Sequence, residues 1–253
     1  MAATVSMSHL KRHEKLQAYV SDLVGRFVNL RNLYAHLDPM IFDEKVTKTW
    51  GSGNANRGFE TIRYTLFFSC IQSIAGMAID ADDRTPCLSK SINALEDKSF
   101  RDYLRAQYSC TVIPYVGDDD PMVLASLKAF EARERVERRI AFDDAYAQML
   151  VQWEKLKISK ELAAFRTVRD KLTAHHELRK KADGYAPVNV VELELKWGAL
   201  RSMVPLLQEI VSDIDLLVRN AGFAYDILDE QLAEASAAFW GTEIRPVTVP
   251  PLR

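Results

Sequence analysis

Apolar residues recur every three or four positions along most of the chain, which is the spacing of helices that bury one face. Glycine and proline are scarce, at ten and nine in 253 residues, and they cluster in short gaps between the periodic segments. No strong strand pattern, internal repeat or low-complexity tract interrupts this arrangement. The pattern therefore predicts an all-α fold in a single domain, residues 1–253.

The predicted helices cover residues 8–36, 57–79, 89–95, 99–108, 122–156, 160–179, 191–220 and 223–240. The first is expected to stop near Pro39, because a proline has no N–H to continue the helical ladder. Pro205 is expected to kink the helix over 191–220 for the same reason. Residues 51–56 and 180–187 are expected to form loops, and residues 245–253 a loose tail.

Two of these helices have informative faces. Residues 57–79 are apolar nearly all round, which predicts a place at the centre of a bundle. In the 122–156 helix, steps of four and three separate a run of large apolar residues: Phe142, Tyr146, Met149, Trp153 and Leu156. This spacing predicts a packed seam. Residues 131–139 alternate Glu and Arg at i,i+4 and are interpreted as a solvated face, not as a basic stripe that faces RNA.

Composition narrows the classes of protein. The chain is 48% hydrophobic and 27% charged, as in ordinary globular proteins, and its net charge of −2 creates no general attraction to nucleic acid. Any RNA contact must therefore come from a local patch. The cysteines Cys70, Cys87 and Cys110 form no CxxC pair and are expected to be reduced and structural. The sequence has no signal peptide and no apolar run of membrane-spanning length, so a cytoplasmic protein with no membrane contact is expected.

Candidate chemistry concentrates in residues 169–177, RDKLTAHHE. Arg169 can clamp a phosphate with its planar fork of donors, and the adjacent His175 and His176 can exchange protons near neutral pH. On a regular helix Arg169 and His176 share one face, whereas His175 reaches that face only if the helix turns near its end. Asp170 can orient either an imidazole or the guanidinium. The alternative is a solvated helix end, where basic residues are favoured.

Other histidines offer weaker signals. Arg31 and His36 repeat the arginine-to-histidine theme at the end of the first helix, and are interpreted as a helix terminus without a functional role. His9 and His13 stand at i,i+4 without a third ligand, so no metal site is predicted. The P-loop, dinucleotide, GxSxG and HExxH signatures are absent, and no cofactor is predicted.

Residues 169–175, RDKLTAH, resemble the motif of the HEPN superfamily, in which an arginine and a polar residue precede a histidine. The motif allows four to six residues between arginine and histidine, and here there are five to His175 and six to His176. The sequence of this segment is most similar to the AbiU-like branch, named for an abortive-infection protein of phage defence. Residues 58–80 with the following DDRT at 82–85 resemble that branch's central helix and its stop, and residues 191–220 resemble its closing helix.

The resemblance implies an up-and-down helical bundle with a core over residues 57–220, extended by an N-terminal helix and a C-terminal tail over 223–253. It also implies a homodimer in which two motifs form one RNA-cleaving site. In that site Arg169 would stabilise charge on the scissile phosphate and His175 would act as general acid or base. Asp170 would position the pair, and His176 is the alternate to His175.

The expected function is a metal-independent endoribonuclease that acts in phage defence or as a toxin, with RNA as substrate and an antitoxin as a possible partner. The alternative is a non-catalytic helical module that kept the HEPN fold and binds nucleotides, RNA or proteins. Cleavage of RNA in the presence of a chelator separates the two, because attack by a ribose 2′-hydroxyl needs no metal.

Overall fold

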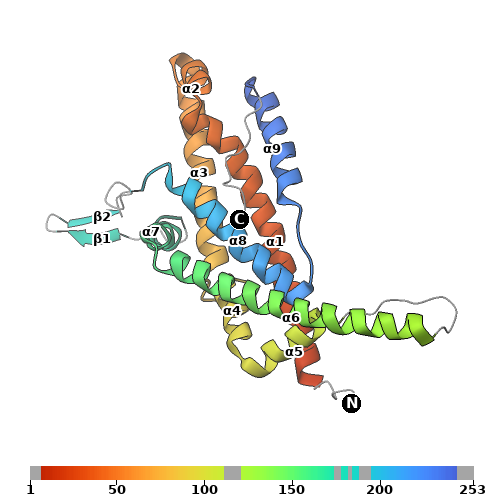
Figure 1. Cartoon of the computed structure of the whole chain (residues 1–253). Helices are drawn as coiled ribbons and strands as arrows, with labels where there is room; N and C mark the ends of the chain where they lie inside the picture. Colours follow the sequence, from red (N-terminus) through yellow and green to blue (C-terminus); the bar gives the residue numbers. More distant parts are fainter. Residues whose placement is uncertain (1–6, 111–120, 174–177, 182–183, 188–194, 244–253) are drawn as a thin grey trace.

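The computed structural model describes residues 7–110, 121–173, 178–181, 184–187 and 195–243. Its centre is a group of long helices that lie side by side (Figure 1): α1 (Met7–Phe42), α3 (Asn56–Ala78), α8 (Ala199–Arg219) and α9 (Tyr225–Trp240). Helix α1 packs against the other three. The prediction of an all-α fold is confirmed.

The remaining elements surround this centre: α2 (Glu44–Trp50), η1 (Gly53–Ala55), α4 (Leu88–Glu96), α5 (Lys98–Tyr108), α6 (Pro121–Lys157), α7 (Lys160–Val168) and the π-helical turn η2 (Arg169–Thr173). Helix α6 packs on α5 and α8, and α7 packs on α3. A small antiparallel hairpin joins β1 (Leu178–Lys181) to β2 (Gly184–Pro187). Within the described ranges, no helix combines the length and the apolar character needed to span a membrane.

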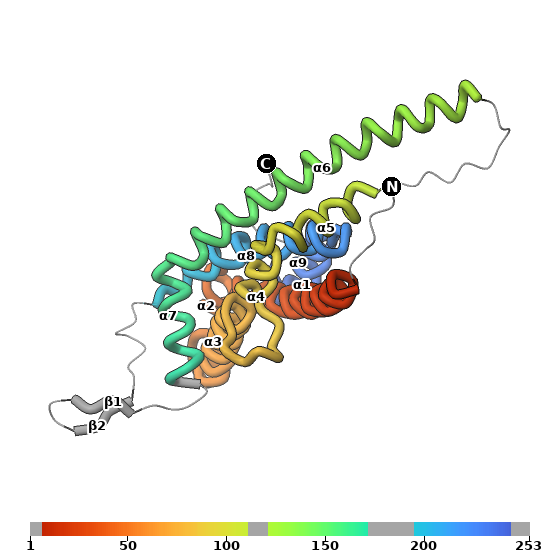
Figure 2. The backbone as a smooth tube through the Cα atoms, turned by 90° about the horizontal axis from the view of Figure 1, so that it is seen from below, coloured from red at the N-terminus to blue at the C-terminus, as the bar shows by residue number. Residues whose placement is uncertain are grey.

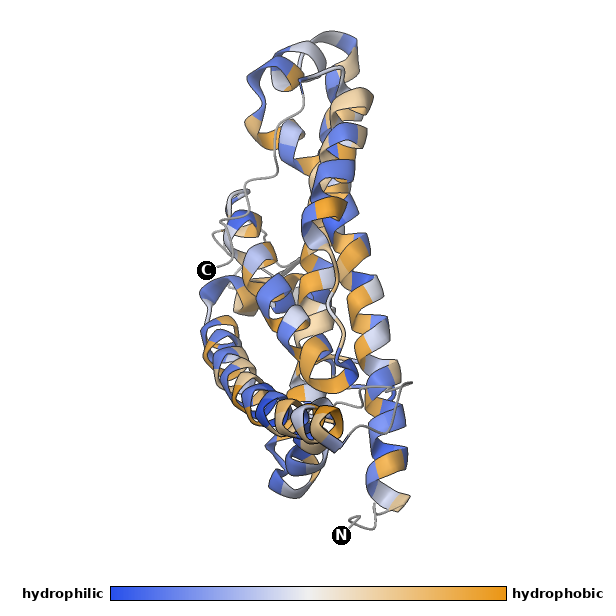
Figure 3. Cartoon of the chain, turned by 45° about the vertical axis from the view of Figure 1, so that its right-hand side comes forward, coloured by the Kyte–Doolittle hydropathy of each residue, from blue (hydrophilic) through white to orange (hydrophobic). Residues whose placement is uncertain are grey.

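The core follows the predicted periodicity. Along α1 the fully buried apolar side chains return every three or four residues: Leu16, Val20, Leu23, Phe27, Leu30, Tyr34 and Leu37. They face the buried half of α3 and the inner face of α8 in one continuous hydrophobic cluster. Figure 3 shows that hydrophilic and hydrophobic residues alternate along the long helices, as expected for helices that bury one face and expose the other.

Helix α1 continues past Pro39, contrary to the prediction that it ends near residue 36. Pro39 cannot donate to the carbonyl of Ala35, but the hydroxyl of Ser236 on α9 donates to that oxygen at 2.8 Å. The indole N–H of Trp240 donates to the next carbonyl, that of His36, at 3.0 Å. Side chains of α9 therefore satisfy carbonyls around the proline, which allows the helix to run on to Phe42.

Three other predictions are corrected. The predicted helix over 160–179 ends at Val168 and passes into η2, and residues 178–187, predicted as helix end and loop, contain the hairpin. Helix α8 begins at Ala199, later than residue 191. Only the second half of α3 is buried nearly all round, whereas Ile62 and Tyr64 in its first half are each 48% exposed.

Helix α6 has two different halves. Its predicted seam is confirmed, because Phe142, Met149, Trp153 and Leu156 are buried and Tyr146 packs against the same core. By contrast, no residue from 121 to 141 is buried, and this half projects beyond the other helices (Figure 2). Most of the predicted solvated face, 131–139, lies in this projecting half, but its last two arginines do not fit the prediction. Arg138 donates to the carbonyl of Tyr108 at 2.9 Å, and Arg139 donates to the hydroxyl of Ser109 at 3.4 Å.

One acidic residue on α8 is poorly accommodated. Oδ2 of Asp213 is buried without a hydrogen-bond donor among the described residues. Burial, reinforced by repulsion from Glu209 one turn earlier, raises the pKa of Asp213 to about 7. The charged carboxylate therefore opposes folding at neutral pH.

We expect the contribution of Asp213 to the stability to fall as the pH rises from about 4 to above 7, because the folded state binds the Asp213 proton more tightly than the unfolded state. Asp213→Asn should raise Tm at pH 8 by several degrees, by less at pH 5, and hardly at all at pH 4. Thermal unfolding followed by circular dichroism at the three pH values measures this. An equal gain at all three values would contradict the assignment.

Candidate active site

Arg169 is placed by the short helix that precedes it. Ser159 caps α7, because its hydroxyl accepts a hydrogen bond from the N–H of Leu162 at 3.2 Å. Leu162, Phe165 and Val168 bury one face of α7 against α3. This packing fixes the end of α7, and with it Arg169, beside the C-terminal end of α3.

The Arg169 guanidinium is held by oxygen atoms on two elements. Nη1 donates to the carbonyl of Ile79 at 3.0 Å and lies 3.4 Å from Oδ2 of Asp80, while Nε donates to Oδ1 of Asp170 at 2.8 Å. Ile79 is the C-cap of α3, where the helix presents carbonyl oxygens and a partial negative charge. The side chain is nevertheless 24% exposed, so an incoming group can reach it.

Asp80 was missed as a site residue, although the segment it ends was singled out from the sequence. Its Oδ1 accepts a hydrogen bond from the N–H of Asp82 at 2.9 Å, which turns Oδ2 toward Arg169. The contact joins the acidic stop after α3 to the RDKLTAH segment, 89 residues away. Two of the three segments on which the resemblance rested therefore meet in space.

The loop between α3 and α4 is tied down by side chains from several elements. Arg26 of α1 donates to the carbonyl of Pro86 at 2.9 Å, and Lys90 of α4 donates to the carbonyl of Thr85 at 3.1 Å. Next to them, hydrogen bonds from Arg84 lower the pKa of the exposed Asp82. These ties give Asp80 and Ile79 a fixed position under Arg169.

A second arginine reaches the same place. A Cβ added to Gly76 on α3 would lie 3.2 Å from Nη2 of Arg26 and 3.7 Å from Nη1 of Arg169. The two nitrogens are thus separated by no more than the sum of these distances. Sequence reasoning missed Arg26. The available signal was Gly76, because a glycine inside a helical pattern can mark a close approach of another group.

His175 and His176 lie outside the described residues, so their positions relative to Arg169 stay a prediction. The regular helix on which His176 would share a face with Arg169 is not present, however. That helix ends at Val168, and the π-helical turn η2 that follows has a wider spacing per turn than an α-helix. The choice between the two histidines therefore depends on the family register and on experiment.

The other arginine-to-histidine pair is structural. Arg31 is only 1% exposed and binds Asp229 of α9 through Nε, at 3.0 Å, and Nη2. His36 was predicted to end the first helix, but α1 continues to Phe42, and His36 packs edge-on against Phe239. Arg31 thus connects α1 to α9 in the interior, away from solvent.

The N-terminal histidines are also structural contacts and do not lie in a loose segment. The ring N–H of His13 donates to the carbonyl of Val218 at 2.8 Å, and His9 packs on Tyr103 with ring centroids 5.5 Å apart. In the described parts of the chain, no three His, Cys, Asp or Glu side chains converge to hold a metal ion.

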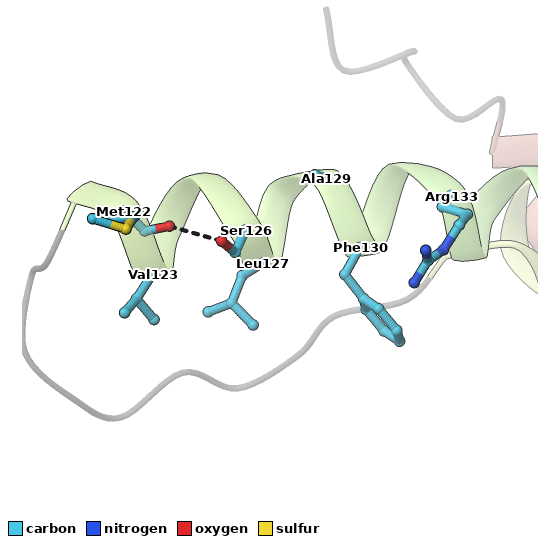
Figure 4. Close-up of a pocket in the computed structure, with 7 residues that line it drawn as sticks. All are labelled: Met122, Val123, Ser126, Leu127, Ala129, Phe130 and Arg133. Carbon is cyan, nitrogen blue, oxygen red and sulfur yellow. Dashed lines mark hydrogen bonds between the residues drawn. The ribbon is translucent and has the colours of Figure 1, made fainter.

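A shallow groove of about 700 Å³ lies at the far end of α6 (Figure 4). Among the described residues, its lining comes from the projecting half of that helix: Met122, Val123, Ser126, Leu127, Ala129, Phe130 and Arg133. It is mainly apolar and contains none of the predicted site residues. The Arg169 cluster at the junction of α3 and η2 is therefore the better candidate for chemistry.

Comparison with protein families decides the classification. The model of the HEPN family described as AbiU2 matches residues 13–239. The chain belongs to the AbiU2 family of HEPN proteins. The AbiU2 match extends beyond the core expected over residues 57–220, and it includes most of α1 and nearly all of α9. No curated protein and no solved structure matches the chain.

Proposed function

We propose that this AbiU2 protein is a metal-independent endoribonuclease whose site is built on Arg169. The observation that carries the proposal is the fixed yet accessible guanidinium of Arg169, which is oriented by Ile79, Asp80 and Asp170 and is 24% exposed. A preoriented cation needs no rearrangement when charge develops on a phosphate, and such groups supply a large part of the rate in phosphoryl chemistry. Its place in the motif of the family agrees with this role.

In the proposed reaction, the ribose 2′-oxygen attacks the adjacent phosphorus and the bond from phosphorus to the 5′-oxygen breaks. His175, or His176 as its alternate, takes the 2′-hydroxyl proton or delivers a proton to the leaving 5′-oxygen. Arg169 stabilises the negative charge on the phosphate oxygens in the transition state. Asp170 keeps the guanidinium in position through its bond to Nε. The products are a 2′,3′-cyclic phosphate and a 5′-hydroxyl.

The test is cleavage of RNA in excess EDTA. We expect purified protein to cut single-stranded RNA in the chelator and to leave 2′,3′-cyclic phosphate ends, because no step requires a metal. His175→Ala should abolish this activity and His176→Ala should weaken it less, if the family register holds. Cleavage that appears only after Mg²⁺ or Mn²⁺ is added would contradict the mechanism.

We also propose a two-fold homodimer that brings two copies of the RDKLTAH segment together, since one arginine and one histidine make a sparse site. Light scattering at micromolar concentration should give about twice the chain mass of 28.7 kDa. A strict monomer that still cleaves RNA would exclude the shared site but not the chemistry.

In the cell, this activity would serve phage defence or act as a toxin held in check by an antitoxin. Expression of the wild-type chain should then arrest growth, and Arg169→Ala should relieve the arrest. The non-catalytic alternative has one observation in its favour, namely that Arg169 already has carboxylate partners and could be structural. Folded protein that binds RNA without cutting it would support that alternative.

A further inference from the structure

We propose that Arg26 of α1 is a second phosphate-binding arginine, which holds the substrate phosphate together with Arg169. The inference rests on the proposed function and adds a residue that lies 143 positions before the motif arginine in the sequence. The supporting observation is that the guanidinium groups of Arg26 and Arg169 both approach the backbone of Gly76.

The geometry suits one tetrahedral anion. Nη2 of Arg26 and Nη1 of Arg169 lie 3.2 and 3.7 Å from the same point above Gly76. Two oxygens of one phosphate can each accept a charge-assisted hydrogen bond of about 2.8 Å, and so bridge donors separated in this way. Because Gly76 has no side chain, both guanidinium groups can approach the backbone of α3 at this point, where a Cβ would crowd Nη2 of Arg26.

Arg26 is itself preoriented. Its Nη1 donates to the carbonyl of Pro86 at 2.9 Å, which leaves Nη2 directed toward Gly76. No hydrogen bond within the described part of the chain uses Nη2. The Arg26 side chain is 32% exposed, and its ion pair with Asp22 is long, at 3.7 Å. The guanidinium is thus fixed at one nitrogen and available at another.

Carboxylates balance the two cations before substrate binds. Asp22 lies beside Arg26, and Asp80 and Asp170 lie beside Arg169. Without them, two like charges at this distance would repel each other. The contact from Asp80 to Nη1, at 3.4 Å, is longer than the contacts of Arg169 with Ile79 and Asp170, and it is the one that a phosphate would replace. Because salt screens the attraction between the two arginines and a phosphate, we also expect RNA binding to weaken as the salt concentration increases.

Phosphate is favoured over a carboxylate ligand for a chemical reason. Planar guanidinium groups that approach from two different helices need an acceptor with oxygens in several directions, and a phosphodiester offers these in a tetrahedron. The partial exposure of both arginines, 24% for Arg169 and 32% for Arg26, fits a backbone phosphate of a nucleic acid strand that passes over the surface. A buried metabolite would need an enclosed cavity.

The experiment compares Arg26→Ala with Arg12→Ala, a control on the same helix. Arg12 also pairs with a carboxylate, that of Asp97, and donates to a carbonyl, that of Ala94, and its exposure of 36% is similar. The readouts are kcat and KM for RNA cleavage, and the anisotropy of a fluorescent 2′-O-methyl RNA that cannot be cut. Arg169→Ala is measured beside them.

We expect Arg26→Ala to lower kcat/KM at least tenfold and to weaken binding of the 2′-O-methyl RNA severalfold, with a Tm close to that of Arg12→Ala. Arg26→Lys should restore part of the binding but little of the rate, because a point charge does not reproduce the planar fork. An Arg26 that only stabilises the fold would instead lower Tm and leave kcat/KM per folded molecule unchanged. An Arg26 that only positions Arg169 through the loop at Pro86 would lower kcat but leave the affinity for the 2′-O-methyl RNA unchanged, which would also overturn the proposal.

The outcomes separate this proposal from the proposed function. If Arg26→Ala cleaves and binds as Arg12→Ala does while Arg169→Ala is inactive, the second arginine is wrong and the nuclease stands. If Arg169→Ala also retains full cleavage, the nuclease site itself is wrong. If the wild type binds RNA but does not cut it, equal binding by Arg26→Ala and Arg12→Ala overturns the proposal, and weaker binding by Arg26→Ala supports it.

Discussion

Arg169→Ala should lower the rate of RNA cleavage by about a hundredfold or more, while the affinity for uncut RNA changes far less. The reason is that the guanidinium is expected to bind the phosphate most strongly when negative charge accumulates in the transition state. Arg169→Lys should fail as well, because a lysine cannot donate to Ile79 and to a phosphate in the same plane. Single-turnover cleavage of a defined RNA measures both variants.

Arg166→Ala is the matched control, since Arg166 is an exposed arginine three residues earlier, on α7 itself. It should keep the wild-type rate. The Tm of Arg169→Ala should stay within a few degrees of wild type, because Asp80 and Asp170 remain partly exposed after the arginine is removed. A folded Arg169→Ala that cleaves at the wild-type rate would refute the proposed nuclease site.

The largest loss of stability is expected for Arg31→Met. This substitution keeps much of the side-chain volume but leaves Asp229, which is 16% exposed, as an unpaired and mostly buried charge. Breaking one side of a buried ion pair typically costs about 3–5 kcal/mol. Urea unfolding at pH 7 should show this decrease in the free energy of unfolding. The loss should be concentrated in α9, which Arg31 connects to α1.

The double variant Arg31→Met/Asp229→Leu tests the cause. Replacing both charges by apolar groups should restore most of the lost stability, because no buried charge is then left without a partner. Arg105→Ala is the control for an ordinary surface pair, since Arg105 and Asp143 are 36% and 53% exposed. It should cost no more than about 1 kcal/mol. A similar cost for Arg31→Met and Arg105→Ala would mean that burial contributes nothing to the Arg31 pair.

Local patterns predicted most of the helices because periodicity and capping act within a few residues. The seam of α6, the Ser159 cap and the helix before Trp240 all follow from such signals. Pro39 is different, because its effect depends on Ser236, about two hundred residues later, whose hydroxyl satisfies the carbonyl that the proline leaves open. No local signal could have extended α1 to Phe42.

The residues of the candidate site also divide into those that local sequence predicts and those that only tertiary packing reveals. Arg169 and Asp170 were found because they stand together in a recognisable segment, and their mutual hydrogen bond joins neighbours in sequence. Asp80 and Arg26 were missed because they approach Arg169 only through the packing of α1 and α7 against α3. Arg31 was interpreted as a helix end, since nothing in its own segment reveals Asp229.

The two halves of α6 should differ in how fast their backbone amide hydrogens exchange with solvent. Residues 121–137 bury no side chain and continue directly from the packed half, so their helix needs no new nucleus. The attachment to the rest of the fold begins at Arg138, which donates to the carbonyl of Tyr108 at 2.9 Å and to the side chain of Asn220 at 2.8 Å. Amide hydrogens in this projecting half should exchange with solvent when the helix frays from its first residue, Pro121, at a rate set by helix propensity. Amides around Met149 and Trp153 should exchange only when α6 separates from α8. One continuous helix therefore contains both the least and some of the most protected backbone of the fold.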